Sequence, residues 1–68
     1  MKYHFHNALG NVIDTNRVEA VSEVHEQQKD YYFVVYLESS SEIAISACSY
    51  NEVNEAREAL IKAVFKHD

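Results

Sequence analysis

The most distinctive hydrophobic pattern in the chain is the stretch YYFVVYL at residues 31–37, which contains only apolar and aromatic residues. Its β-branched and aromatic residues are typical of a strand, in which successive side chains point to opposite faces. One predicted face carries the larger aliphatic and Phe side chains, Tyr31, Phe33, Val35 and Leu37. The other predicted face carries Tyr32, Val34 and Tyr36. Both faces are apolar, so the pattern predicts that each of them needs cover.

The N-terminal pattern predicts a hairpin. Residues 3–7 alternate between apolar and polar side chains, which indicates a half-buried strand. The apolar set is Tyr3 and Phe5, and the polar set is His4 and His6. The turn sequence ALGN follows, and its Gly10 can adopt a positive φ. We therefore expect residues 11–14 to form the returning strand.

Two further segments flank the apolar stretch. In residues 18–26 the valines recur every third position, which fits neither a regular strand nor a full helix, so we expect a strand with a bulge near Ala20 or Val21. The triple serine at 39–41 predicts a turn. Residues 42–47 then alternate two isoleucines with small residues, which predicts a returning strand that pairs with residues 31–38.

A helix is predicted over residues 50–66. Ser49 and Glu52 have the spacing of a capping box, in which the serine hydroxyl accepts a hydrogen bond from the third helical amide. Cys48 and Val53 occupy the staple positions on either side of this cap, so Cys48 is expected to be shielded beneath the helix. At about 100° per residue one apolar stripe forms along the helix. Its members are Val53, Ala56, Leu60, Ala63 and Val64.

These elements place residues 1–68 in one α+β domain, an antiparallel β-meander of four to five strands with one C-terminal helix packed across one face. The strands are expected at about 3–7, 11–14, 18–26, 31–38 and 42–47. The Phe33 face is expected to meet the helix. Its other expected core partners are Tyr3, Phe5, Ile43 and Ile45.

Length and charge limit the classes of partner. The chain has 68 residues and a formal net charge of −5, and its bases are scattered rather than clustered. Nucleic-acid binding is disfavoured because it needs a basic face, whereas a basic protein partner would suit the acidic surface. No apolar run approaches the about 20 residues that cross a bilayer. With one cysteine and no apolar leader-like segment, we expect a cytoplasmic protein with no membrane association.

Two sets of side chains are weak candidates for chemistry. His4 and His6 share a strand face and could bind a metal together with His25 or Glu23, but no third ligand is fixed by the spacing. Cys48 could act as a nucleophile with a histidine base. Because neither set has a recognisable motif, we expect no metal, no cofactor and no catalytic activity.

The face that carries Tyr32, Val34 and Tyr36 is expected to lie beside Ala44, away from the helix. Tyrosine is enriched at protein interfaces, so a homodimer formed by packing two such faces is the favoured interpretation. The N-terminal hairpin could instead fold over this face and close a small barrel. A third alternative is an exposed platform for a partner protein or a small molecule.

The helix adds three candidate interface residues. Ile61 and Phe65 lie beside the apolar stripe and would form a second apolar edge. Arg57 lies between them and the stripe. It could lay its stem on Ile61 and pair with Asp14, Glu19 or another Glu, or it could anchor an interface as a hot-spot residue.

The sequence therefore favours a small non-enzymatic protein-interaction module that acts as a homodimer. Small size and missing motifs are also typical of accessory proteins of phages and mobile genetic elements, which is a further hypothesis. The sequence also allows two alternatives. One is a small-molecule-binding protein with a Tyr-lined pocket, and the other is an enzyme that depends on a metal or on Cys and His.

Overall fold

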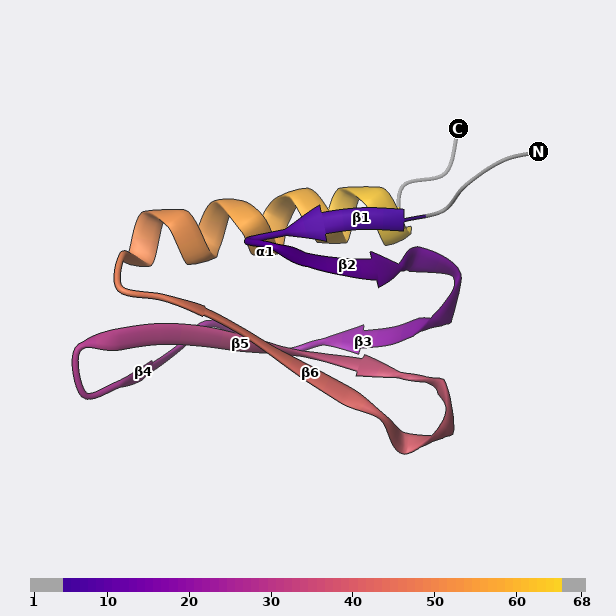
Figure 1. The fold of residues 1–68 in the computed structure, drawn as a ribbon, viewed down its shortest axis with the longest axis horizontal. Coiled ribbons are helices and arrows are strands. Elements are labelled where there is room, and N and C mark those ends of the chain that lie inside the picture. The colour runs from indigo at the N-terminus through magenta and orange to yellow at the C-terminus, as the bar shows by residue number, and fades with distance from the viewer. Residues whose placement is uncertain (1–4, 66–68) are drawn as a thin grey trace.

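The structure is a computed structural model in which residues 5–65 are described, and it has two layers (Figure 1). The strands are β1 (Phe5–Ala8), β2 (Asn11–Asp14), β3 (Val18–Val21), β4 (His25–Gln27), β5 (Asp30–Leu37) and β6 (Glu42–Ala47). Short 3-10 turns occupy Thr15–Arg17 and Glu38–Ser40, and the helix α1 spans Tyr50–Phe65. One layer is the sheet of β3, β4, β5 and β6, and the other contains α1 and the β1–β2 hairpin. The predicted α+β class with antiparallel strands and a C-terminal helix is confirmed, with six strands among the described residues.

The strand β5 is the centre of the larger sheet. It pairs antiparallel with β6 from Tyr31↔Ala47 to Tyr36↔Glu42. Along its opposite edge β5 pairs first with β4 and then with β3. The predicted single strand over 18–26 is wrong, because Ser22–Val24 do not belong to a strand and separate β3 from β4. A register shift between Val18 and Ala20 agrees with the expected bulge.

The β1–β2 hairpin forms a separate two-stranded sheet. Its turn residues Leu9 and Gly10 have φ values of 51° and 87°, as a two-residue hairpin turn of the primed type requires. The Gly10 N–H donates to Asn7 Oδ1 at 2.9 Å, which closes the turn. This turn sets the register His6↔Ile13 and Ala8↔Asn11. Because alternate residues share a face, these four side chains point to the same side of the hairpin.

The face of β1 that points inward is opposite to the expected one. Ala8 and Ile13 are buried and His6 is half-buried, whereas Phe5 is 60% exposed. The prediction that Phe5 belongs to the core is therefore wrong. Its expected partner Tyr3 lies outside the described residues.

One apolar core joins both layers. Its buried members are Ala8, Ile13, Phe33, Val35, Ile45, Val53 and Leu60. The expected core positions of Phe33, Val35 and Ile45 are confirmed, and Tyr31, Leu37 and Ile43 pack against the same cluster. Since the hairpin residues Ala8 and Ile13 share this core with the helix, the hairpin covers the helix side of the sheet. The alternative in which the hairpin closes a barrel over the other face is wrong.

The helix begins at the predicted cap. The Glu52 N–H donates to Ser49 Oγ at 3.5 Å, and the Val53 N–H donates to the Ser49 carbonyl at 3.2 Å. Val53 is fully buried, but Cys48 is exposed, so its expected position beneath the helix is wrong. Ala56, Leu60 and Val64 face the core as expected. Ala63, the remaining member of the predicted stripe, is exposed.

Removal of the helix cap should lower stability measurably. In Ser49→Ala the Glu52 amide loses its side-chain acceptor, which typically costs about 1 kcal/mol in the free energy of unfolding. Urea denaturation followed by circular dichroism measures this loss. The matched control Ser46→Ala removes an exposed strand hydroxyl and should change stability by less than about 0.5 kcal/mol. Equal losses in the two variants would show that Ser49 does not act as a cap.

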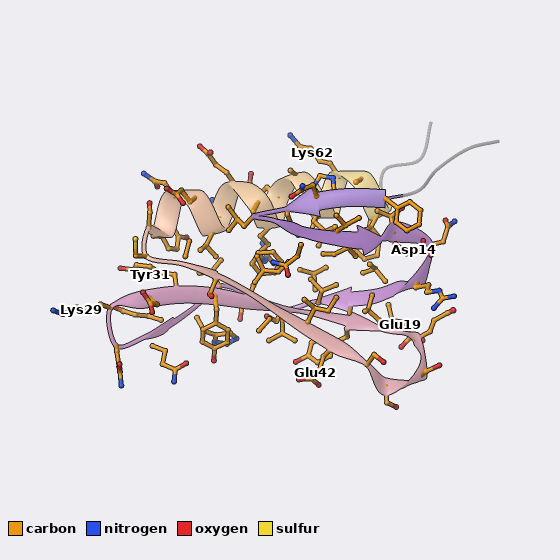
Figure 2. All side chains as sticks on the ribbon, in the orientation of Figure 1. Asp14, Glu19, Lys29, Tyr31, Glu42 and Lys62 are labelled. Carbon is orange, nitrogen blue, oxygen red and sulfur yellow. The ribbon has the colours of Figure 1, made fainter. Side chains whose placement is uncertain are left out.

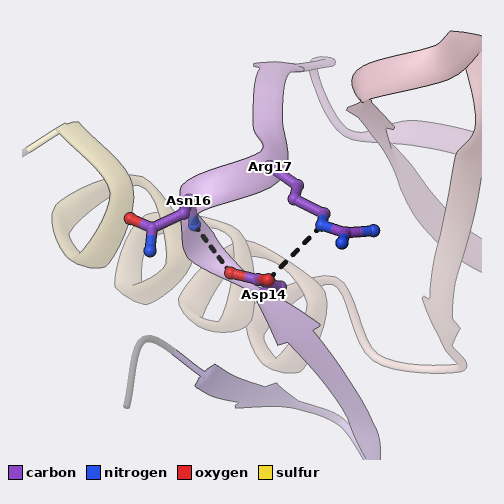
Figure 3. A network of polar contacts seen from close by, with 3 residues as sticks. All are labelled: Asp14, Asn16 and Arg17. Atoms are coloured by element: carbon purple, nitrogen blue, oxygen red, sulfur yellow. Dashed lines mark hydrogen bonds and ion pairs between the residues drawn. The ribbon is translucent and has the colours of Figure 1, made fainter. Parts of the chain in front are cut away.

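The connection between the two layers is a short polar turn (Figure 3). Asp14 Oδ1 accepts a hydrogen bond from the Asn16 N–H at 3.0 Å, and Asp14 Oδ2 lies 3.5 Å from Arg17 Nε. Since the Arg17 side chain is largely exposed, the ion pair contributes little, and the Asp14 cap is the more important contact. This turn directs the chain from the hairpin into β3.

Candidate interaction surface

The side of the sheet opposite the helix carries the predicted tyrosine face. Tyr32, Val34 and Tyr36 alternate with the buried Phe33 and Val35, so they point away from the helix. Pairing places further side chains beside them: Ala44 beside Val34, Ala20 and Glu42 beside Tyr36, and His25 and Ser46 beside Tyr32. We call the surface formed by Ala20, His25, Tyr32, Val34, Tyr36 and Ala44 the outer face.

The outer face is apolar at its centre and partly open to solvent. Tyr36 is 41% exposed and Ala44 is exposed, whereas Tyr32 and Val34 are half-buried by their neighbours in the sheet. The ring of His25 lies against that of Tyr32, with centroids 5.3 Å apart and a tilt of 31°. Neither the hairpin nor the helix covers this surface, since both pack on the opposite side. Residues 5–65 therefore leave it without intramolecular cover.

An acidic residue lies at each end of the outer face. Glu42 pairs with Tyr36 at one end, and Asp30 begins β5 at the other. Figure 2 shows Glu42 on the side of the sheet away from the helix and Tyr31 on the helix side. The Tyr31 ring contacts Tyr50 of α1 edge to face, with centroids 5.5 Å apart. Thus adjacent tyrosines of β5 have different roles, one in the core and one on the outer face.

A shallow pocket adjoins the Tyr32 end of the outer face. Its volume is about 460 Å³. It is lined by Gln27, Gln28, Asp30, Tyr32, Ala44 and Ser46. The lining combines one aromatic ring with amide, hydroxyl and carboxylate groups, so the pocket offers hydrogen bonds and one acid to a small polar ligand.

Arg57 binds the interrupted edge of the sheet. Its Nε donates to the Ser22 carbonyl at 2.7 Å. That carbonyl is available because the Val34 N–H donates to Ser22 Oγ at 2.8 Å, in place of the usual ladder bond to the carbonyl. The Ser22 N–H still donates to the Val34 carbonyl at 2.9 Å. Arg57 therefore joins the helix to the break between β3 and β4, and none of the predicted acidic partners is its hydrogen-bond partner.

Loss of the Arg57 contact should destabilise the fold. In Arg57→Met the apolar stem is largely kept, but the Ser22 carbonyl loses its donor, which costs about 1–2 kcal/mol in unfolding free energy. The control variant is Arg17→Met. Chemical denaturation of the two variants measures the loss of unfolding free energy in each. The control removes a side chain that is 71% exposed and should cost less than about 0.5 kcal/mol. A loss no larger than that of the control would contradict the structural role of Arg57.

The predicted interface residues do not form one surface. Ile61 is half-buried and Phe65 is 46% exposed, and both lie on α1. The helix α1 packs on the side of the sheet opposite the outer face. The sheet therefore separates Arg57, Ile61 and Phe65 from the outer face. The structure brings together Tyr32, Val34, Tyr36 and Ala44.

The histidine and cysteine candidates are also separated. His25 lies on the outer face against Tyr32, whereas His6 belongs to the hairpin on the helix side. His4 lies outside the described residues. Within residues 5–65, no group of three or more His, Cys, Asp or Glu side chains has the arrangement of a metal site. The structure thus gives no support to a ligand set built from His6, Glu23 and His25.

Comparison with known proteins gives no relative from which function could be transferred. No family model, curated protein or solved structure matches the chain. Within the described part of the chain, no helix is long and apolar enough to span a membrane.

Proposed function

We propose that the chain is a small non-enzymatic protein-interaction module that forms a homodimer by packing the outer face against that of a second copy. The observation that carries this proposal is the lack of intramolecular cover over an apolar tyrosine surface. A strand with two apolar faces needs a partner on each of them. The helix and hairpin cover one face of β5, and a second copy would cover the other.

The chemistry of the outer face suits such an interface. Tyr32 and Tyr36 can bury their rings while each hydroxyl remains near the solvated rim. Val34 and Ala44 are cross-strand neighbours and provide an apolar centre between them. The acidic residues Asp30 and Glu42 lie toward the ends, where they can stay hydrated. This arrangement of an apolar centre and a polar rim is that of typical protein interfaces.

Thermal unfolding at several protein concentrations tests the proposal. Because a homodimer is stabilised by mass action, its Tm rises with concentration. We expect this rise over the micromolar to sub-millimolar range. A Tm that stays constant across the same range would contradict self-association.

A second candidate function is binding of a small polar molecule in the pocket beside Tyr32. The observation that favours it is the mixed lining of one aromatic ring, two glutamines and Asp30. A thermal-shift screen with metabolites tests this candidate, and Gln27→Leu should remove any stabilisation found. For both candidates we propose a cytoplasmic location and no nucleic-acid partner, on the basis of the net charge and the acidic rim.

A further inference from the structure

The two long edges of the larger sheet differ in their accessibility to another strand. On one side, β3 and β4 are separated by Ser22–Val24, and β3 carries a register shift. Such interruptions are devices that protect a sheet edge from pairing with another chain. On the other side, β6 is a continuous strand of six residues without proline or lysine. The β6 edge therefore lacks the protection of the opposite edge.

The backbone groups on the β6 edge can be assigned from the ladder. The Leu37 N–H donates to the Ser41 carbonyl at 2.8 Å, and orientations alternate along an antiparallel strand. Ile43, Ile45 and Ala47 consequently direct their N–H and C=O groups toward β5. Glu42, Ala44 and Ser46 direct theirs away from it. The Val34 backbone confirms this alternation independently, since its N–H and C=O both face Ser22 rather than Ala44.

These outward groups are accessible. Glu42, Ala44 and Ser46 are all exposed, and β6 pairs only with β5 in the described chain. Ile43, whose side chain points to the core side, is only half-buried and so leaves apolar surface at the same edge. An added strand could thus form backbone hydrogen bonds and place an apolar side chain beside Ile43.

The charge around this edge selects the type of strand. The strand β6 carries one charged residue, Glu42, and the 3-10 turn before it carries Glu38. The chain as a whole has a formal net charge of −5. Glu42 itself projects from the edge on the outer side. A second copy would bring the same acids to the edge, whereas a basic strand would complement them.

We propose that the β6 edge binds an extended basic segment of a partner protein by strand addition. Backbone hydrogen bonds to Glu42, Ala44 and Ser46 would hold the segment. An apolar residue of the segment would lie beside Ile43, and its basic residues would lie beside Glu42. This partner site uses the outward backbone groups of β6, whereas the outer face uses side chains, and Ala44 belongs to both. Strand addition does not require the homodimer.

A designed peptide tests the proposal on the full chain. The probe has about seven residues that alternate Lys with Val, which matches the length of β6 at about 3.3 Å per residue. Titration into ¹⁵N-labelled protein should shift the amide signals of Glu42, Ala44 and Ser46 first. A peptide that alternates Glu with Val should not bind. A form of the basic peptide that is N-methylated at the backbone N–H groups facing β6 cannot donate these hydrogen bonds. Its affinity should be lower by about tenfold or more.

Two protein variants complete the test. Ala44→Pro removes an outward N–H without breaking the β5–β6 ladder, so the fold should persist while peptide binding weakens about tenfold or more. Ala44→Val keeps the N–H and should bind as the wild type does. Equal binding of the acidic or N-methylated peptide, or unchanged binding to Ala44→Pro, would overturn the proposal.

Discussion

The variant Tyr36→Arg should be a folded monomer under conditions in which the wild-type protein is a dimer. Tyr36 is 41% exposed on the outer face, so arginine can extend into solvent without disturbing the core. In the proposed dimer the guanidinium would be desolvated between apolar faces, and its cross-strand neighbour Glu42 would be desolvated with it. The effective desolvation penalty is several kcal/mol per ion, so a net cost of about 3 kcal/mol would raise the dissociation constant about a hundredfold. Light scattering measures the mass, and circular dichroism verifies the fold.

The matched control for this variant is Val12→Arg. Val12 is an exposed apolar strand residue at 64%, and the substitution changes the net charge equally. It lies on the hairpin, which packs on the opposite side of the sheet, so the control should dimerise as the wild type does. A dimer that survives in Tyr36→Arg, or one that is lost in Val12→Arg, would contradict the placement of the interface.

The variant Phe33→Ala should lose most of the stability of the fold. Phe33 is fully buried between the sheet and the helix, and truncation of such a side chain costs about 3–5 kcal/mol. At about 0.05–0.15 kcal/mol per residue, a chain of this length has roughly 3–10 kcal/mol in total. We therefore expect a partly or wholly unfolded protein, which near-ultraviolet circular dichroism and urea denaturation would detect.

The same substitution at Phe5 provides the control for Phe33→Ala. Because Phe5 is largely exposed, Phe5→Ala should cost less than about 1 kcal/mol. The pair of variants also tests the orientation of β1. If Phe5→Ala proved as damaging as Phe33→Ala, the sequence-based position of Phe5 in the core would be favoured over the structure.

The residues that could be assigned from the sequence are those with a strong local signal. The two faces of β5 follow from strand alternation, and Phe33 and Val35 are buried as predicted. The capping contact between Ser49 and Glu52 follows from their spacing. In both places one physical rule acts alone, so sequence and structure agree.

The N-terminal hairpin shows where such rules fail. The register is set by a turn in which Leu9 has a positive φ, a conformation that leucine disfavours and that the sequence does not indicate. Alternation alone does not give the direction of each face, and the aromatic side chain of Phe5 favours the wrong face as the core side. Burial of Ala8 and Ile13 in the structure reverses that assignment.

The break between β3 and β4 has a similar origin. Ser22 replaces a ladder bond with its hydroxyl, and Arg57, 35 positions later in the chain, donates to the released carbonyl. A contact of this range leaves no local pattern. For the same reason the sequence does not place Ala20 and His25 on the outer face, because their cross-strand partners depend on the register after the bulge. The spacing of Val18, Val21 and Val24 by three residues is the signal in the sequence that this segment pairs irregularly with β5.

The most direct test of the central claim is an isotope-filtered nuclear Overhauser experiment on a mixture of labelled and unlabelled protein. It detects contacts between two copies and excludes those within one chain. The proposed dimer predicts contacts from the rings of Tyr32 and Tyr36 in one copy to the methyl groups of Val34 and Ala44 in the other. The absence of any contact between copies, or contacts that involve only α1 and the hairpin, would contradict the account.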